Sequence, residues 1–432
     1  MEKIFTRVFS VALGVYLIMA PARVSAATYY VDSAGNDANS GTITAPFRST
    51  TKGVSMLSAG DTLYVRAGTY SSFTVSRSGT ATSPITISGY NNEFPTISGG
   101  IGIRLSGVSY VKVQGFEVTG ATGNGIKRMG GVVIQNGNNN TIENCRIHDN
   151  NIDSPNGIKV EGASSNNRLI YNTVYSNGGP DGGSGIRFYN PTSTQSTGNE
   201  IGWNTVYNNI GTVGNSDGIS VVDRIVYTNI HDNVVYGNGD DGIDVWNTQY
   251  NTIVNNKSYS HVIGDGNGFK LGGYDANGIG GNNTIRNNHA FSNKYNGFDS
   301  NGSGGNQYEG NQSYNNGSST FSNNAWGFID TRRSGDTRPS SMVNNNSYNN
   351  KTANYARDTY TTTFSGNTET PPTSPTPIPS PTPMPWTTIE ADYSTWLSHY
   401  LQQLTGFANG DFSNNGIVDG VDYLLWAIKY GN

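Results

Sequence analysis

Three carboxylates lie within five positions of a chain that is only 13% charged: Asp240, Asp241 and Asp244, in the stretch GNGDDGIDVWN. Carboxylates held this close repel one another unless a positive charge lies between them. The stretch contains asparagine and glycine but no histidine or cysteine, and oxygen ligands of this kind suit a hard cation. Because Ca²⁺ tolerates irregular ligand geometry better than Mg²⁺, we predict a calcium site here.

The elements that position these residues follow from a repeat of the form N-x-x-[YF]-x-[NH]. Its copies begin at Asn172, Asn204, Asn233, Asn256, Asn288, Asn311 and Asn345, at intervals between 23 and 34 residues. Unequal intervals are typical of a solenoid whose coils differ in loop length, and each coil is too small to bury a core alone. We therefore predict an all-β, parallel β-helix over residues 27–368, with the asparagines and the aromatic residues stacked in ladders.

A second marker in the same coils predicts which residues line one surface. It reads GIKV, GIRF, GISV, GIDV, GFKL and GFDS, starting at Gly157, Gly185, Gly218, Gly242, Gly268 and Gly297. Alternation along a strand points the residue after each apolar position outward, and stacking then gives the column Lys159, Arg187, Ser220, Asp244, Lys270 and Asp299. The residues before each glycine give a second column, Asn156, Ser184, Asp217, Asp241, Asn267 and Asn296.

These columns bring four aspartates and one lysine together. Asp217, Asp240, Asp241 and Asp244 are expected to converge from two adjacent coils, with Lys270 one coil away. Next to a bound cation the charged form of Lys270 is disfavoured, so its pKa should fall towards that of a usable base. The alternative is structural, because Asp-Gly is common at turns and a lysine between two aspartates relieves their repulsion.

The stretch from Asp217 to Asn301 resembles the family nine polysaccharide lyases, pectate lyases with a right-handed parallel β-helix. The resemblance rests on DDGIDVWN, on the lysine of GDGNGFKLGG and on NGFDSN. It implies that Asp217, Asp240, Asp241 and Asp244 hold a catalytic Ca²⁺ and that Lys270 is the base of a β-elimination on polygalacturonate. Further basic residues are candidates for binding neighbouring uronates or are ordinary solvated surface: Arg187, Lys257, Lys294, Arg332 and Arg333. We interpret His261 and His289 as structural.

The ends of the chain predict other modules. Residues 1–26 are typical of an export signal, because basic residues precede an apolar run and small residues follow it. Near residues 48–57 a short amphipathic segment is expected to form a helix that caps the solenoid. Residues 369–386 are a proline-rich linker. Residues 387–432 resemble a dockerin, a small α-helical module of the EF-hand type, with one calcium loop formed by Asp411, Ser413, Asn415, Ile417, Asp419 and Asp422.

Composition limits the partners. Without residues 1–26 the formal charge falls from -5 to about -7, which argues against a basic surface for nucleic acid. No later apolar run is long enough to span a membrane, and the single cysteine, Cys145, excludes an intramolecular disulfide.

We therefore expect a secreted, extracellular and monomeric calcium-dependent pectate lyase that acts on polygalacturonate, attached to a cell surface or to a cohesin through its tail. Two alternatives stay open: a lyase for another acidic polysaccharide, and a non-catalytic β-helix surface protein that binds glycan. Loss of product formation in Lys270→Ala, with folding intact, would separate an enzyme from a binding protein.

Overall fold

The computed structural model describes residues 26–371, with gaps at 124–128, 152–155, 181, 212–214, 262, 274–279, 318–323 and 358–361. Residues 1–25 of the predicted export signal lie outside the described residues. So do residues 372–386 of the predicted linker and the whole of the predicted module 387–432, with its calcium loop from Asp411 to Asp422. Those features remain predictions.

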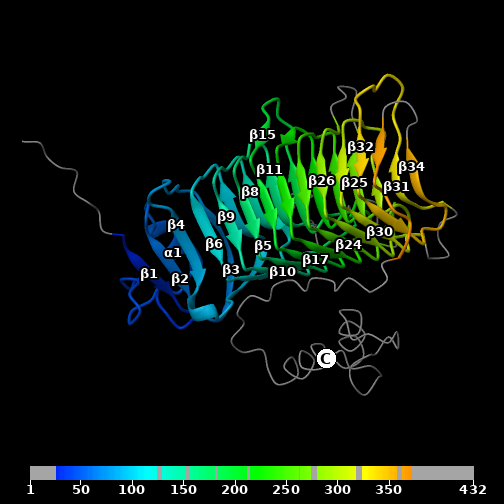
Figure 1. Cartoon of the computed structure of the whole chain (residues 1–432). Helices are drawn as coiled ribbons and strands as arrows, with labels where there is room; N and C mark the ends of the chain where they lie inside the picture. Colours follow the sequence, from blue (N-terminus) through cyan, green and yellow to red (C-terminus); the bar gives the residue numbers. More distant parts are fainter. Residues whose placement is uncertain are drawn as a thin grey trace, which may run out of the picture. The chain divides into compact units, whose positions relative to one another are not determined.

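The described chain winds into a solenoid of parallel strands, as the repeats predict (Figure 1). A complete coil contributes one strand to each of three rows, and the coils at the two ends contribute fewer. In chain order a coil runs from the second row to the first and then to the third, and all of the strand pairings are parallel.

The first row is the 13-stranded sheet, made of β1 (Thr28–Val31), β2 (Thr62–Val65), β4 (Ile85–Gly89), β6 (Val111–Gln114), β9 (Thr141–Glu143), β12 (Arg168–Ile170), β16 (Glu200–Gly202), β20 (Asn229–His231), β23 (Thr252–Val254), β26 (Thr284–Arg286), β29 (Gln307–Glu309), β32 (Ser341–Val343) and β35 (Thr363–Ser365). The second row is made of β3 (Thr69–Val75), β5 (Thr96–Ser106), β8 (Gly130–Gln135), β11 (Asn156–Glu161), β14 (Ile186–Tyr189), β18 (Ile219–Val222), β22 (Ile243–Trp246), β25 (Phe269–Gly272), β28 (Phe298–Asp299), β31 (Trp326–Asp330) and β34 (Ala353–Arg357). The third row is made of β7 (Glu117–Thr119), β10 (Arg146–His148), β13 (Thr173–Tyr175), β17 (Thr205–Tyr207), β21 (Val234–Tyr236), β24 (Lys257–Tyr259), β27 (His289–Phe291), β30 (Gln312–Tyr314) and β33 (Asn346–Tyr348).

The second and third rows join into one sheet because the long strand β5 pairs with β7 at its start and with β8 at its end. Outside the rows, β15 (Ser196–Thr197) pairs with β19 (Ile225–Val226), and η1 (Tyr90–Asn92) is a short 3-10 turn. The core is a continuous apolar column inside the three rows. In β22, for example, Ile243 and Val245 are fully buried in that core, while Asp244 alternates to the other face.

The predicted asparagine ladder is confirmed. Asn204 illustrates it: its Oδ1 accepts hydrogen bonds from the backbone N–H of Asn172 at 2.9 Å and from the Asn172 amide at 3.1 Å. Its own amide donates to Asn233 Oδ1 at 3.0 Å and to the carbonyl of Leu169 at 2.8 Å. The same pattern continues through Asn256, Asn288, Asn311 and Asn345. Buried amides are therefore satisfied by their counterparts in the adjoining coils.

The aromatic residues of the repeat also stack as predicted. The rings of Tyr175, Tyr207, Tyr236, Tyr259, Phe291, Tyr314 and Tyr348 form one pile with neighbouring centroids 4.7 to 5.1 Å apart. This distance is close to the ordinary spacing of paired strands.

A helix forms within the predicted capping segment. Helix α1 (Thr50–Met56) begins after Ser49, whose hydroxyl accepts the backbone N–H of Lys52 at 3.1 Å. Val54 and Leu57 are buried in the core, and a Cβ at Gly53 would lie 2.7 Å from the Val31 side chain. The helix therefore packs tightly against the first coil. Within the described residues no helix has both the length and the apolar character needed to cross a membrane.

Candidate active site

The outward column of the second row has the predicted register. Lys159 pairs with Arg187, Arg187 with Ser220, Ser220 with Asp244, and Asp244 with Lys270. Lys270 in turn pairs with Asp299. Asp244 and Lys270 are therefore direct neighbours on β22 and β25.

The column that precedes the glycines is also in register. The backbone N–H of Gly218 donates to the carbonyl of Asp241 at 3.0 Å, which places Asp217 beside Asp241. The chain passes from the third row to the second at a tight corner, where only glycine fits. A Cβ at Gly242 would lie 1.8 Å from Ser258 Oγ and 2.5 Å from His261 Nε2. Glycine therefore allows the chain to pack closely at this corner. Asp241 lies before the corner and Asp244 lies after it, and both side chains point away from the core.

The carboxylate oxygens of three of the aspartates lie close together and are buried just below the protein surface. Asp217, Asp241 and Asp244 are 2%, 0% and 9% exposed, and one oxygen of each lies within 4.8 Å of the others. Oδ1 of Asp217 and Oδ1 of Asp244 are buried and have no hydrogen-bond partner among the described residues. Buried polar atoms are normally satisfied, so these oxygens fit the ligand set of a hard cation.

The electrostatics of this group agree with that interpretation. Burial raises the pKa of Asp217 to about 6, with a further contribution from Asp240. Burial likewise raises the pKa of Asp241 to about 7, against the opposing effect of Lys270. The pKa of Asp244 is also well above its ordinary value, because of burial and of Asp217. Carboxylates held in this way gain a large free energy from a bound cation.

Asp240 is placed differently. It is 6% exposed, and both of its oxygens accept backbone hydrogen bonds: Oδ2 from Asn215 at 2.9 Å and Oδ1 from Asp265 at 2.6 Å. It therefore ties two loops to β22. One oxygen of Asp240 also lies within 4.8 Å of oxygens of Asp241 and Asp265, so it borders the group formed by Asp217, Asp241 and Asp244.

Lys270 faces these carboxylates. Its Nζ lies 3.1 Å from Oδ2 of Asp241 and 2.7 Å from Oδ2 of Asp265. Burial alone would lower the pKa of Lys270, but Asp241, Asp244 and Asp265 outweigh it and raise the pKa above its ordinary value. The sequence-based expectation of a lowered pKa assumed a cation next to the lysine. The carboxylates of the protein itself raise the pKa of Lys270.

Asp265 is a site residue that the sequence reasoning missed. It lies on the loop between β24 and β25, outside both columns, and it is 62% exposed. Its backbone N–H is held by Asp240, and its carboxylate is paired with Lys270. The only sequence signal is its position five residues before the lysine in GDGNGFK.

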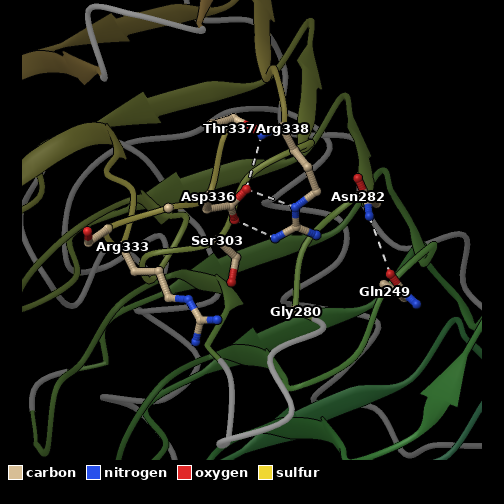
Figure 2. A pocket seen from close by; sticks show the side chains of 10 residues that line it. Gln249, Gly280, Asn282, Ser303, Arg333, Asp336, Thr337 and Arg338 are labelled. Carbon is tan, nitrogen blue, oxygen red and sulfur yellow. Dashed lines mark hydrogen bonds and ion pairs between the residues drawn. The ribbon is translucent and has the colours of Figure 1, made fainter.

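A groove of about 510 Å³ contains this group and opens to the surface. It is lined by Arg187, Asp217, Ser220, Asp244, Asp265 and Lys270, and further along by Asp223, Trp246 and Asn301. Of the predicted substrate-binding residues, Arg187 lies in this groove. A second cavity of about 460 Å³ contains Arg333 and is shown in Figure 2.

The other three basic candidates lie elsewhere. Lys294 donates to the carbonyl of Gly264 at 2.6 Å and so fastens the loop that carries Asp265. Lys257 is buried on the third row, where burial lowers its pKa to about 8. The Arg332 side chain is 3% exposed and pairs at 3.0 Å with the fully buried Asp330. These contacts are structural, and they correct the interpretation of Arg332 as a surface residue.

The two histidines interpreted as structural have no place in the groove. His261 is fully buried and its Nδ1 accepts the backbone N–H of Asn238 at 3.2 Å, which continues an asparagine ladder. Burial lowers its pKa to about 3. His289 lies on the third row, where burial and Lys257 lower its pKa to about 4.

Comparisons with known proteins agree with this geometry. The chain is 29% identical over 309 residues to "Pectate lyase PEL9" of Emericella nidulans. The aligned region covers 65% of this chain and 70% of the relative. It is 29% identical over 288 residues to "Pectate lyase L" of Dickeya dadantii, which covers 61% of this chain and 59% of that relative. The chain thus spans less than two thirds of the second protein.

Solved structures show the same fold. A crystal structure of pectate lyase Pel9A aligns with a TM-score of 0.51 at 22% identity, over 79% of this chain and 78% of that one. A rhamnogalacturonan lyase aligns with a TM-score of 0.52 at 21% identity, over 93% and 98%. The profile described as "Pel9A-like, right handed beta helix region" matches residues 29–323, which include the whole of the aspartate and lysine group. On that match, the chain belongs to the Pel9A-like right-handed β-helix family.

Proposed function

We propose that this protein is a calcium-dependent pectate lyase that cleaves polygalacturonate by β-elimination. Family membership and the two pectate lyases among its relatives support the enzyme class, a polysaccharide lyase. The observation that carries the finer proposal is the group formed by Asp217, Asp241 and Asp244, three buried carboxylates whose oxygens converge beside Lys270.

In this proposal three of the four predicted ligands, Asp217, Asp241 and Asp244, would hold Ca²⁺. Asp240, the fourth, orients the two loops that border the site. The ion, when bound, supplies a positive charge that binds the uronate carboxylate and acidifies the proton on the neighbouring carbon, C5. Arg187 lines the same groove and supplies a second positive charge for a uronate carboxylate.

Lys270 then removes the C5 proton. The C5–H electron pair forms the double bond between C4 and C5, the bond from C4 to the glycosidic oxygen breaks, and that oxygen takes a proton from solvent. The products are a new chain end and a 4,5-unsaturated uronate. Because no water attacks the sugar, the paired carboxylates of a glycoside hydrolase are not required.

Lys270 must be neutral to accept a proton. Asp241, Asp244 and Asp265 hold it in the charged form. Neutralising those carboxylates, as binding of a divalent cation does, removes the groups that raise the lysine's pKa. The same carboxylates that bind the cation therefore control whether the base is available.

The direct test is absorbance near 235 nm, where a 4,5-unsaturated uronate is expected to absorb, with polygalacturonate and either Ca²⁺ or excess chelator. We expect a calcium-dependent rise that is lost in Lys270→Ala and kept in Lys112→Ala, a matched lysine on the first row that pairs with Glu143 at 2.8 Å. If absorbance rises with alginate or another uronate polymer but not with polygalacturonate, the protein is a lyase with that polymer as its substrate. No rise on any uronate would make the aspartate group a structural ion site.

We also propose export and surface attachment, on the export-signal pattern of residues 1–26 and the dockerin-like pattern of residues 387–432. Removal of residues 1–26 from the protein secreted by its native host would support the first. Calcium-dependent binding of residues 387–432 to a cohesin would support the second, and its absence would leave the tail a structural helical pair.

A further inference from the structure

The turn that enters the first row holds one residue of most coils in the left-handed backbone conformation. At this position the chain uses residues that adopt it readily, namely Asn139, Asn166, Gly198, Asn282 and Gly305. Three coils carry a tyrosine there instead: Tyr110 at φ 57° and, in two neighbouring coils, Tyr227 at φ 53° and Tyr250 at φ 60°. Bulky side chains are uncommon in this conformation because of steric strain, and such strain is concentrated at functional sites.

Burial does not account for Tyr227 and Tyr250. Tyr227 is 58% exposed and Tyr250 is 45% exposed, and their rings stack with centroids 5.2 Å apart and an angle of 11° between planes. The aromatic pile of the third row is different, because its members lie on strands and none of them is exposed. Tyr227 and Tyr250 instead form an exposed aromatic pair, and exposed aromatic rings are the kind of surface that pyranose rings stack on.

The second cavity is lined by a residue next to Tyr250 in the sequence. Gln249, the residue before Tyr250, lines the cavity, and so does Asn282, the next member of the turn column. The Asn282 amide donates to Gln249 Oε1 at 3.3 Å. Figure 2 shows this pair at the right, the ion pair of Asp336 with Arg338 near the centre, Ser303 below that ion pair, and Arg333 at the left. Amides, a hydroxyl and guanidinium groups are suited to sugar hydroxyls and carboxylates.

The cavity and the groove of the candidate active site are lined by nearby residues of the same two segments. Trp246 and Asn301 line the groove, while Gln249 and Ser303, three and two residues further along the same two segments, line the cavity. One extended chain could therefore occupy both. A cavity with convergent polar groups close to exposed aromatic residues is typical of a ligand-binding site.

We propose that Tyr227, Tyr250 and the cavity around Arg333 form an accessory subsite for uronate units distant from the bond that is cleaved. Tyr227 and Tyr250 stack on sugar rings, and Arg333 faces a uronate carboxylate. This inference rests on the proposed function for the identity of its ligand, and it makes the enzyme selective for long chains. Binding energy from remote units then serves to hold the reacting unit at Lys270.

The test replaces both tyrosines by the residue that the fold uses elsewhere at this position, in the double variant Tyr227→Asn with Tyr250→Asn. Because asparagine tolerates the left-handed conformation, the melting temperature should not fall. On polygalacturonate we expect KM to rise by roughly three- to tenfold with kcat within about twofold, the scale of one aromatic stacking contact. On trigalacturonate, which is too short to reach both regions, KM should not change.

Trp203→Asn is the matched control. Trp203 has φ 53°, is 39% exposed and stacks on Tyr171 at 4.9 Å, but it lies on the turn from the first row to the third. The control should leave KM on the polymer unchanged. An unchanged KM in the double variant, or an equal rise in the control, would overturn the subsite.

Binding measured by calorimetry separates this inference from the proposed function. If the wild-type protein eliminates no uronate, the lyase proposal fails, but weaker binding of polygalacturonate by the double variant alone would still support the subsite. Equal binding by the wild-type, double-variant and control proteins would overturn it, whether or not the protein is a lyase.

Discussion

The Lys270 ammonium lies 2.7 Å from the Asp265 carboxylate, although Lys270 stands directly beside Asp244 in the strand register. Asp265 comes from a loop and not from the second row, so it adds a carboxylate that the stacked columns do not contain. Asp241, Asp244 and Asp265 together hold the lysine in its charged form. The proposed base is therefore restrained by its own surroundings until those charges are compensated.

The first prediction concerns Asp265→Asn. Asp265 raises the pKa of Lys270, so removing its charge should lower that pKa. Since the base must be neutral, the limb of the rate–pH profile on which activity rises with pH should move to lower pH. The measurement is kcat/KM on polygalacturonate between pH 6 and pH 11 at saturating Ca²⁺.

Asp149→Asn is a suitable control for that experiment, because Asp149 is a 56% exposed carboxylate that pairs with His148 away from the groove. Its profile should match the wild type. A limb that stays in place or moves to higher pH in Asp265→Asn would show that Asp265 does not control the lysine. A higher calcium requirement in the variant would instead identify Asp265 as a ligand.

The second prediction concerns stability against pH without and with calcium. Asp217 and Asp241 have folded-state pKa values of about 6 and about 7, above the unfolded value of 3.8. Between pH 4 and pH 7 these two groups bind more protons in the folded state than in the unfolded state, so their contribution to stability should fall as pH rises through this window. The buried His261 and His289 act in the opposite direction, because their pKa values are lowered to about 3 and about 4. The aspartate contribution is therefore isolated with Asp241→Asn: in chelated protein, the melting temperature at pH 7 relative to that at pH 4.5 should be higher in this variant than in the wild type.

Calcium should reverse this trend, because it binds the ionised carboxylates of the folded state. At 100 times its Kd the ion adds about 2.7 kcal/mol to the free energy of unfolding. Calorimetric melting at both pH values, with calcium and with chelator, tests this. A calcium effect at pH 4.5 as large as that at pH 7 would mean that the ion binds elsewhere. In that case Asp217→Asn would leave the effect intact.

Register and side-chain alternation explain why much of the site could be predicted from the sequence. The positions of Asp217, Asp241, Asp244 and Lys270 depend only on a glycine that marks each coil and on the period of two along a strand. Asp265 could not be found in this way, because a loop residue has no register. The burial of Arg332 was also hidden, since its partner Asp330 is revealed only by the packing of β31.

The lowered pKa expected of Lys270 applies to the protein with a bound cation and stays a prediction, whereas the raised pKa is set by the protein's own carboxylates. Sequence reasoning placed the lysine beside a cation, whereas its distances to Asp241 and Asp265 show that carboxylates are its immediate neighbours. The left-handed backbone conformation of turn residues such as Tyr250 likewise could not be predicted from a repeat that was aligned on strands. Functional residues are often found on turns and loops, and the positions of such residues cannot be predicted from the strand repeat.

The third prediction separates two arginines. Arg332 is buried with Asp330, and removing one partner of such a pair leaves a buried charge, so Arg332→Ala should lower the free energy of unfolding by about 3–5 kcal/mol. Arg187 lines the groove, so Arg187→Ala should instead raise KM on polygalacturonate by roughly ten- to a hundredfold, the scale of a charge-assisted contact. Denaturant unfolding and steady-state kinetics on both variants distinguish the two roles. The same KM increase in both would make Arg332 a substrate contact after all.

The last prediction tests the asparagine ladder that holds the coils of the site together. Asn256 Oδ1 accepts the backbone N–H of Asn233 at 3.0 Å and the Asn233 amide at 2.9 Å, and all of these groups are buried. Asn256→Ala leaves two buried donors without partners, at about 1–3 kcal/mol each, so we expect a loss of about 2–6 kcal/mol in urea unfolding.

The neighbouring Asn255→Gly is the matched control. Asn255 is exposed and has φ 58°, a conformation that glycine also adopts, so its replacement should change stability by less than about 1 kcal/mol. Asn256 lies in the coil that carries Asp244, and its amide donates to Asn288 in the coil that carries Lys270. Asn256→Ala should therefore also weaken the calcium-dependent increase in melting temperature. If Asn256→Ala and Asn255→Gly unfold at the same urea concentration, the ladder bonds follow from the coil packing and do not stabilise it.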